Sequence, residues 1–212
     1  MIDDETRAIY GRAKVELRKR LRALRATTPE SACAERSARI VSSLVAMPAI
    51  ESASRVALFW PIVARHEVDL RVLDASLRAR GVTLAYPSID PETRDMTFRV
   101  TARREDLEER GFGFEEPAQG APVIEALDVI IVPQRHRRGR ALRSLCGRPR
   151  GHRLGYGAGF YDRTLPHWSP PALKVAVVFD YQLLVELPFT ETDVAMDWIV
   201  TDTRVFQAEN GP

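Results

Sequence analysis

Three glycines alternate inside a ten-residue segment that begins with arginine and ends with aspartate. The segment is Arg153-Leu-Gly-Tyr-Gly-Ala-Gly-Phe-Tyr-Asp162, and an apolar, helix-competent stretch follows it. Glycines let successive backbone N–H groups form a concave nest, and a helix start adds the positive end of its dipole, so both favour phosphate. Arg153 would add a charge-assisted contact, and Asp162 would hold Mg²⁺ against the phosphates. The spacing matches neither the Walker pattern nor the dinucleotide fingerprint, so the spacing alone leaves a plain flexible turn as an alternative.

The elements that must position this segment alternate between strands and helices. Short apolar runs that end at proline predict buried strands at 55–60, 82–86 and 128–132, and weaker runs predict strands at 96–100, 174–179 and 198–201. Helical spacing predicts helices at 6–25, from Thr28-Pro29 onward with a capping hydroxyl and proline at the first position, and at 70–80 before a glycine. Alternating strands and helices predict an α/β fold with a mainly parallel sheet covered on both faces. In such sheets ligands bind beyond the carboxyl ends of the strands.

Composition narrows the class of protein. The 212 residues suit a single domain, and 45% of them are hydrophobic, which is enough for a substantial core. The net charge is only +2, which argues against a dedicated nucleic-acid binder. The charged N-terminus lacks the apolar region of a signal peptide, and no apolar run approaches the length of a membrane span. We therefore expect a cytoplasmic protein in which Cys33 and Cys146 are free thiols.

The whole glycine segment, Arg153 to Asp162 with the arginine that follows, closely resembles the signature loop of the 5-formyltetrahydrofolate cyclo-ligase family. Further segments resemble that family in the same order along nearly the whole chain. They are Lys14-Val-Glu-Leu-Arg18, Glu67-Val-Asp69, Gly111-Phe-Gly-Phe-Glu-Glu-Pro117, Asp128-Val-Ile-Ile-Val-Pro133, and the C-terminal pattern of Gln182, Leu187-Pro188, Asp193, Asp197 and Thr201. The resemblance implies a three-layer α/β/α fold of the phosphosugar-isomerase/CoA-transferase-like kind.

The resemblance also implies a reaction, in which ATP hydrolysis drives ring closure of 5-formyltetrahydrofolate to 5,10-methenyltetrahydrofolate. The formyl oxygen attacks the γ-phosphate, N10 of the folate then attacks the activated carbon, and phosphate leaves. Such phosphoryl transfer needs in-line positioning and neutralised charge more than a protein nucleophile. The implied cofactor is Mg²⁺, with ATP as co-substrate, and we expect a monomer that binds no nucleic acid.

The resemblance assigns roles to particular residues. Arg153 and Asp162 are the implied catalytic residues. The implied ATP-binding residues are Lys14, Arg18, Arg153, Leu154, Gly155, Tyr156, Gly157, Ala158, Gly159, Phe160 and Tyr161. The implied substrate-binding residues are Ile62, Glu67, Phe112 and Tyr156, and the implied metal ligands are Asp162 and Asp193.

Each of these assignments has a plainer alternative. Lys14 and Arg18 lie one turn apart and would otherwise form a solvated basic helix face. Glu67 would otherwise be an acid near a helix N-terminus, and Asp193 a loop cap. Ile62, Phe112 and Tyr156 would otherwise be packing residues.

One segment departs from the family. Residues Gln134–Arg150 are longer than the usual link, carry seven arginines and no acid, and lack the family's aromatic-Asp pair. Three interpretations compete: a basic insertion that meets phosphate or a polyglutamate tail, a solvated loop without function, and a stretch translated out of frame, which we favour. Two rival functions are a nucleotide-binding protein of the same fold with lost or changed activity, and a nucleic-acid-binding protein that uses the basic segments.

Overall fold

The computed structural model of the chain describes residues 27–111, 113–133, 159–168, 170–183 and 194–208, together with residues 5, 9, 10, 12, 15, 16, 19 and 23. These eight positions between 5 and 23 are all helical, as the sequence predicts for residues 6–25. The other positions up to residue 26 lie outside the described residues. No helix within the described part is long and apolar enough to cross a membrane.

A seven-stranded sheet forms the centre of the molecule, in the order β3-β2-β1-β6-β7-β8-β9. The five inner strands run parallel, and the two outer strands, β3 and β9, are antiparallel to their neighbours. The strands are β1 (Arg55–Ala57), β2 (Thr83–Ile89), β3 (Met96–Val100), β6 (Val129–Pro133), β7 (Leu173–Val177), β8 (Trp198–Val200) and β9 (Val205–Gln207). The mainly parallel sheet predicted from the sequence is therefore confirmed.

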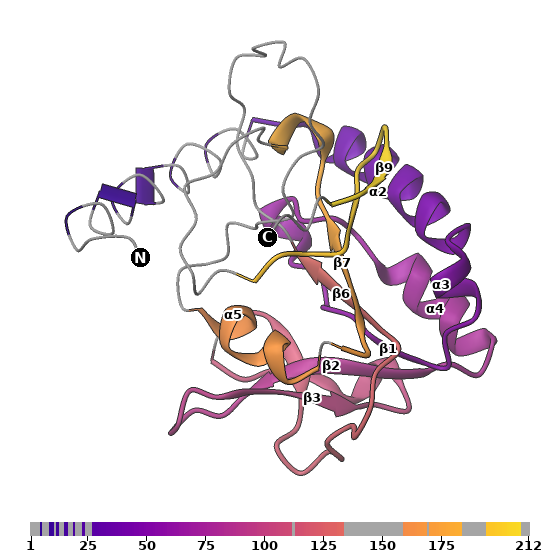
Figure 1. Cartoon of the computed structure of the whole chain (residues 1–212), viewed down its shortest axis with the longest axis vertical. Coiled ribbons are helices and arrows are strands. Elements are labelled where there is room, and N and C mark those ends of the chain that lie inside the picture. Colours follow the sequence, from indigo (N-terminus) through magenta and orange to yellow (C-terminus); the bar gives the residue numbers. More distant parts are fainter. Residues whose placement is uncertain are drawn as a thin grey trace.

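Helices cover both faces of this sheet (Figure 1). On one face lie α2 (Glu30–Val45), α3 (Pro48–Glu51) and α4 (Arg71–Ala79), and on the other lie α5 (Phe160–Thr164) and the short η3 (Leu165–His167). Alternating residues of β6 divide between the two faces, because successive side chains of a strand point in opposite directions. Val129 and Ile131 join the core under α2 and α4, whereas Ile130 and Val132 join the core under α5. The arrangement is the expected three-layer α/β/α fold.

The strand order creates a switch point between β1 and β6. From β1 the chain crosses through α4 to β2 on one side, and from β6 it crosses through α5 to β7 on the other side. Open α/β sheets bind their ligands beyond the carboxyl ends of the strands at such a switch point.

The strand β2 passes through Pro87, although the sequence predicted that this proline ends it. Pro87 pairs with Phe98 of β3. On its other side β2 has already lost its partner, because the last contact with that strand is the bond from Leu58 N to the Ala85 carbonyl at 2.9 Å. Proline has no N–H to donate, but at this position the neighbouring strand has ended and no donor is needed.

Other boundaries also differ from the sequence prediction, two of them close to the turn after β1 and to helix α2. The first strand stops at Ala57 rather than at residue 60, and the chain then turns toward η1 (Val63–Arg65). Helix α2 begins at Glu30 with Pro29 at the N-cap, and no side chain caps it. The hydroxyl of Thr28, expected to cap the helix, instead donates to the hydroxyl of Tyr181 at 3.4 Å.

Candidate functional site

The turn that follows β1 brings together two residues predicted to bind substrate. The carboxylate of Glu67 accepts a hydrogen bond from the backbone N–H of Ile62 at 3.1 Å. Between them η1 ends at His66, whose backbone is left-handed with φ of 50°. A non-glycine residue in this conformation stores strain that the surrounding structure must hold, and such residues concentrate at functional sites. The turn therefore fixes Glu67 at the carboxyl edge of the sheet.

The alternative role of Glu67 at the start of the next helix falls to another acid. Asp69 accepts the backbone N–H of Arg71, the first residue of α4, at 3.0 Å and also pairs with the Arg71 guanidinium at 2.6 Å. Burial raises the pKa of Asp69, but the hydrogen bonds from Arg71 outweigh it and leave the pKa below its ordinary value. The pterin-binding role of Glu67 stays a prediction.

A short hairpin lies against this turn. Its strands are β4 (Leu107–Glu109) and β5 (Glu115–Pro117), and η2 (Arg104–Asp106) leads into it. The guanidinium of Arg104 stands 4.2 Å from the ring centroid of Trp60 and forms an ion pair with Glu115 at 2.6 Å. The hairpin contains the family-like segment 111–117, so the structure places that segment beside the turn of Ile62 and Glu67. Phe112 itself lies outside the described residues.

The base of the hairpin is tied to the carboxyl end of β2 through Glu116. This side chain is fully buried, and its Oε2 accepts the backbone N–H of Ile89 at 2.7 Å. The carbonyl of Ile89 accepts from the amide of Gln119 at 2.8 Å. Burial raises the pKa of Glu116, against the opposing effect of the Ile89 hydrogen bond. Beyond the end of β1, Glu116 and Gln119 thus provide the hydrogen-bond partners for the backbone N–H and carbonyl of Ile89 in β2.

The end of the glycine segment forms the start of α5. Gly159 is the N-cap and has φ of 69°, a left-handed conformation that glycine adopts at little cost. A Cβ there would also stand 3.0 Å from Nη1 of Arg163. Phe160 and Tyr161 pack against the core on this face of the sheet. The hydroxyl of Thr164 donates to the Met96 carbonyl at 3.0 Å and so anchors the helix to β3.

Asp162 lies on the first turn of α5 and is half-buried. Its Oδ1 accepts the backbone N–H of Val194 at 3.5 Å, a long hydrogen bond. Asp193, the second predicted metal ligand, directly precedes Val194 in the chain. The hydrogen bond therefore places Val194, the neighbour of Asp193, against Asp162, the first predicted ligand. The described residues contain no group of three or more histidine, cysteine, aspartate or glutamate side chains arranged to hold a metal ion.

Many predicted residues lie outside the described part of the chain. The described ones are Ile62, Glu67, Gly159, Phe160, Tyr161 and Asp162, and the structure places them all at the carboxyl edge of the sheet, in two groups that follow β1 and precede β7. Those outside the described residues are Lys14, Arg18, Phe112, Asp193 and the segment from Arg153 through Leu154, Gly155, Tyr156 and Gly157 to Ala158. The arginine-rich segment 134–150 also lies outside them.

Sequence reasoning missed several residues that organise this edge. Thr164 and Arg163 connect α5 to β3 and to Arg94, whose carbonyl accepts from Arg163 at 3.4 Å. The guanidinium groups of both arginines lie within 6 Å of the Phe160 ring, at 5.5 and 5.7 Å. The contacts of α5 with Arg94 and Met96 join positions about 70 residues apart in the chain, so no local pattern marks them.

The fold and the geometry of this edge define an α/β enzyme whose ligands would bind beyond the carboxyl ends of β1, β6 and β7. The sequence model of the 5-formyltetrahydrofolate cyclo-ligase family matches residues 11–202. The chain therefore belongs to that family.

Individual relatives agree with this membership. A 5-formyltetrahydrofolate cyclo-ligase of Escherichia coli is 28% identical over 188 residues, which cover 86% of this chain and 96% of that protein. One from Mycolicibacterium smegmatis is 43% identical over 96 residues, a match that spans 44% of either chain. The NMR structure of a 5,10-methenyltetrahydrofolate synthetase from Aquifex aeolicus is similar with a TM-score of 0.75 and 28% identity, over 94% of both chains. A synthetase from Mycoplasma pneumoniae, 21% identical with a TM-score of 0.67, shares the fold.

Proposed function

We propose that this chain converts 5-formyltetrahydrofolate to 5,10-methenyltetrahydrofolate with ATP and Mg²⁺, releasing ADP and phosphate, as part of folate one-carbon metabolism. The observation that carries the proposal is that two groups of predicted site residues lie at the same edge of the sheet. The Ile62–Glu67 turn follows β1, and Asp162 on α5 lies in the connection from β6 to β7. The family match over residues 11–202 gives these groups their substrates.

The reaction divides into two steps that the edge must hold in line. In the first step the formyl oxygen forms a bond to the γ-phosphorus, and the bond from that phosphorus to the β-phosphate oxygen breaks to release ADP. In the second step N10 bonds to the formyl carbon and loses its proton, and the bond from this carbon to the phosphate oxygen breaks. The protein contributes positioning and charge neutralisation, because the atoms that react all belong to the substrates.

The nucleotide would lie against the glycine segment. We propose that Arg153 and the backbone from Leu154 to Tyr161 cradle its phosphates, with Lys14 and Arg18 as further cations. Gly159 supports this proposal, because its left-handed backbone and its lack of a Cβ suit a close approach.

The folate would lie against the turn after β1. We propose that Glu67 binds the pterin and that Ile62, Phe112 and Tyr156 form the walls of its slot. The contact of Arg104 with the Trp60 ring supports the placement of the folate, because it holds the hairpin of β4 and β5 beside that turn. Aromatic and apolar walls suit a flat heteroaromatic ring.

The residues present fit a magnesium ion. Carboxylate oxygens are the ligands that Mg²⁺ takes together with substrate phosphates. Asp162 presents a half-buried carboxylate, and its contact with Val194 brings the neighbour of Asp193 to it. When bound, the ion would neutralise charge on the transferring phosphoryl group. We propose Asp162 and Asp193 as its ligands.

The test is to incubate the purified protein with ATP, Mg²⁺ and 5-formyltetrahydrofolate and to follow the methenyl chromophore. We expect the chromophore to appear only when all three are present. A protein that binds ATP but never forms the chromophore would instead be a nucleotide binder of the same fold. Tight, salt-sensitive binding of RNA or DNA without turnover would favour the nucleic-acid interpretation.

We also propose a monomeric, single-domain, cytoplasmic enzyme with no membrane or nucleic-acid partner. The arginine-rich segment 134–150 needs its own experiment, in which a short Gly/Ser link replaces it. If the segment is out of frame or merely solvated, the shortened protein folds and keeps its activity, because loop length changes closure entropy only slowly. If its arginines serve phosphate or polyglutamate, the Michaelis constant rises, and the rise shrinks at high salt.

A further inference from the structure

An exposed arginine in the turn after β1 has no partner. Within the part of the chain that the structure describes, the guanidinium of Arg65 makes no hydrogen bond, ion pair or ring contact. Every other arginine described from residue 27 onward makes at least one such interaction. Water solvates an exposed guanidinium, so the missing partner costs little by itself. Its meaning depends on where the guanidinium is held.

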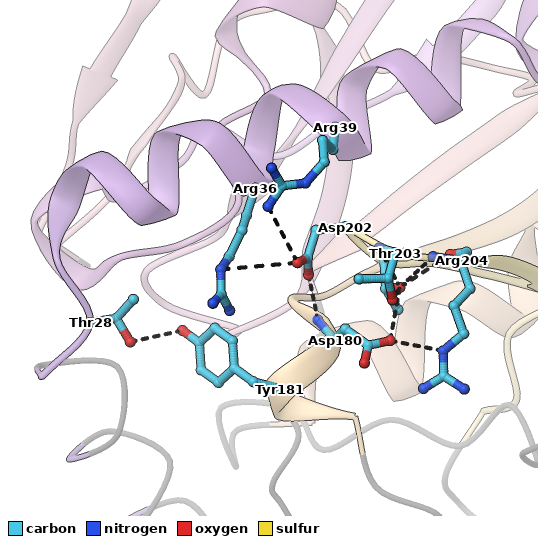
Figure 2. Close-up of polar contacts among 9 residues, drawn as sticks. Thr28, Arg36, Arg39, Asp180, Tyr181, Asp202, Thr203 and Arg204 are labelled. Carbon is cyan, nitrogen blue, oxygen red and sulfur yellow. Dashed lines mark hydrogen bonds and ion pairs between the residues drawn. The ribbon is translucent and has the colours of Figure 1, made fainter.

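Arginines beyond the ends of β7 and β8 are paired with acids of the protein. Arg36 and Arg39 of α2 lie 4.0 and 3.8 Å from the buried carboxylate of Asp202 (Figure 2). Arg204 pairs with Asp180 at 2.9 Å, close after the end of β7 (Figure 2). These cations connect elements of the fold to one another, because each faces an acid on another segment. The positive charge of Arg65 has no such use within the described chain.

The backbone of Arg65 belongs to the same hydrogen-bonded turn as Glu67. Arg65 is the last residue of η1, and its N–H donates to the Ile62 carbonyl at 2.9 Å. The left-handed His66 follows it, and the Glu67 carboxylate closes the turn by accepting the N–H of Ile62 at 3.1 Å. Arg65 is exposed, whereas Glu67 and Ile62 are half-buried. The turn therefore presents a cation to solvent beside the residues proposed to hold the pterin.

The loop between β4 and β5 leaves room for this guanidinium. Gly113 has φ of 75°, and a Cβ at this position would stand 3.0 Å from Nη2 of Arg65, so a larger residue would displace the arginine or the loop. Oε1 of Glu109 accepts the backbone N–H groups of Gly111 and Gly113, at 2.8 and 2.7 Å, and so fixes the loop. The Glu109 carboxylate forms no ion pair with Arg65. The hairpin therefore holds the guanidinium on one side while the residue stays exposed.

Charge and exposure together indicate which part of a substrate Arg65 meets. The planar fork of a guanidinium matches a carboxylate or a phosphate. Transfer of a phosphoryl group needs a site that excludes water, and the exposed Arg65 does not fit that requirement. A flat pterin suits the half-buried walls of the turn, whereas the negatively charged glutamate end of a folate is costly to bury and stays toward solvent. The ligand group that fits Arg65 is therefore a carboxylate.

We propose that Arg65 binds a carboxylate at the glutamate end of 5-formyltetrahydrofolate and selects for substrates that carry this charge. The inference rests on the proposed function, since it takes the folate as the ligand of the turn after β1. The guanidinium lies against Gly113 and forms no ion pair with Glu67, so the two side chains can meet different ends of one substrate. Two N–H groups of the guanidinium would donate to the two oxygens of one carboxylate.

The experiment combines a change in the protein with a change in the substrate. Arg65→Met removes the charge and keeps an unbranched side chain. The α,γ-diamide of 5-formyltetrahydrofolate removes both carboxylate charges and keeps the size of the ligand. The dissociation constants of the diacid and of the diamide are measured by calorimetry without ATP, so the readout needs no turnover. The matched control is Arg39→Gln, which removes an exposed arginine that already lies beside Asp202.

We expect the unchanged protein to bind the diacid about threefold to fivefold more tightly than the diamide, the range of an exposed ion pair. Arg65→Met should lose this preference and bind the diamide as well as the unchanged protein does. Arg39→Gln should keep the preference. Added salt should reduce the preference of the unchanged protein, because exposed charges are screened. Since Arg65 has no partner in the described chain, Arg65→Met should not change the melting temperature.

The inference is overturned if Arg65→Met keeps the preference for the diacid, or if it loses affinity for both ligands alike. It is also overturned if the unchanged protein has no preference. Should Arg65→Met fail to fold, Arg65→Gln carries the same test. The failure of the proposed function looks different. A protein that binds both ligands but never forms the methenyl product refutes the reaction and still tests Arg65, whereas a protein that binds neither ligand refutes both proposals.

Discussion

The polar side chains at the two ends of the parallel strands differ in how completely they are hydrogen-bonded. At the amino ends, Asp128 accepts the backbone N–H groups of Ser54 and Arg55, both at 2.9 Å, and pairs with the Arg55 guanidinium at 2.8 Å. Asp197 likewise accepts the backbone N–H of Lys174 at 2.8 Å and lies 3.3 Å from its ammonium group. At the carboxyl ends, Glu116 and Gln182 each keep a buried atom without a partner.

The difference separates structure from function within one sheet. The acids at the amino ends tie neighbouring strands together and use their oxygens in doing so. At the carboxyl ends, Glu116 and Gln182 each leave one buried side-chain atom without a partner, at a cost of about 1–3 kcal/mol each. Ligands of such sheets bind at the carboxyl ends, and violations of polar satisfaction are expected where function needs them. Mutations at the two ends should therefore affect different quantities.

The largest expected effect is a loss of stability at the amino end. Asp128→Ala removes an acceptor of three hydrogen bonds, so the free energy of unfolding should fall by about 2 kcal/mol. For a chain of this size that lowers the melting temperature by about 4–8 °C. The turnover number should not change, because the residue is at the end of the sheet opposite the site. Thermal unfolding by circular dichroism and the methenyl assay measure the two quantities.

Acid provides the control for this variant. Burial raises the pKa of Asp128, but its bonds with Arg55 and Ser54 outweigh this and leave the pKa lowered. The stability it contributes is therefore present above its unfolded pKa of about 3.9 and is lost as the pH falls through the lower folded value. The gap between Asp128→Ala and the unchanged protein should close below about pH 4. A gap that stays constant in acid, or a lower turnover number at pH 7, would contradict the structural role.

The next effect concerns the carboxyl end and should appear in catalysis. Asp162→Asn keeps an oxygen that can accept from Val194 but loses the charge that would hold Mg²⁺. We expect turnover to fall at least about tenfold, or about 1.4 kcal/mol in the barrier, with little change in melting temperature. The rate should be measured at limiting and at saturating Mg²⁺. An unchanged rate at limiting Mg²⁺ would make Asp162 a structural cap and would weaken the contrast between the two ends.

The sequence predicted the layers of the fold better than the limits of its strands. Apolar runs such as residues 129–132 mark strands buried on both faces, because every position is apolar whichever face it meets. Where a strand ends depends on its neighbours. β2 continues through Pro87 because β1 has already ended there, and that information lies in the pairing, not in the residues. The hairpin of Leu107–Glu109 and Glu115–Pro117 is short and charged, so no period marked it.

In the candidate site, too, local contacts could be predicted from the sequence, whereas contacts between distant residues could not. Ile62 and Glu67 are five residues apart, and the turn between them could be placed from the sequence at a strand end. The contact of Thr164 with Met96 joins residues 68 apart, and no local signal predicts it. Gln182 fitted the family's C-terminal pattern, but its unused donor is a property of its surroundings. A pattern names a residue, whereas only the packed structure shows that its hydrogen bond is missing.

The smallest expected effect tests whether the unused oxygen of Glu116 belongs to the fold or to the site. Burial raises the pKa of this carboxyl group, so its contribution to stability is full below its unfolded pKa of about 4.3 and is lost as the pH rises through the folded value. Glu116→Gln is neutral at every pH and keeps an oxygen for Ile89 N. The two proteins should therefore melt alike near pH 4, and the variant should melt higher at pH 7.5, by less than the loss expected for Asp128→Ala.

Glu115→Gln is the control, since it removes the ion pair with Arg104 and should give no such gain. If Glu116→Gln melts higher at neutral pH and also keeps its turnover number, the ionised carboxylate has no part in the reaction, and the contrast between the two ends rests on Gln182 alone. If turnover falls while stability rises, Glu116 is a group that the fold leaves unsatisfied for the benefit of the site.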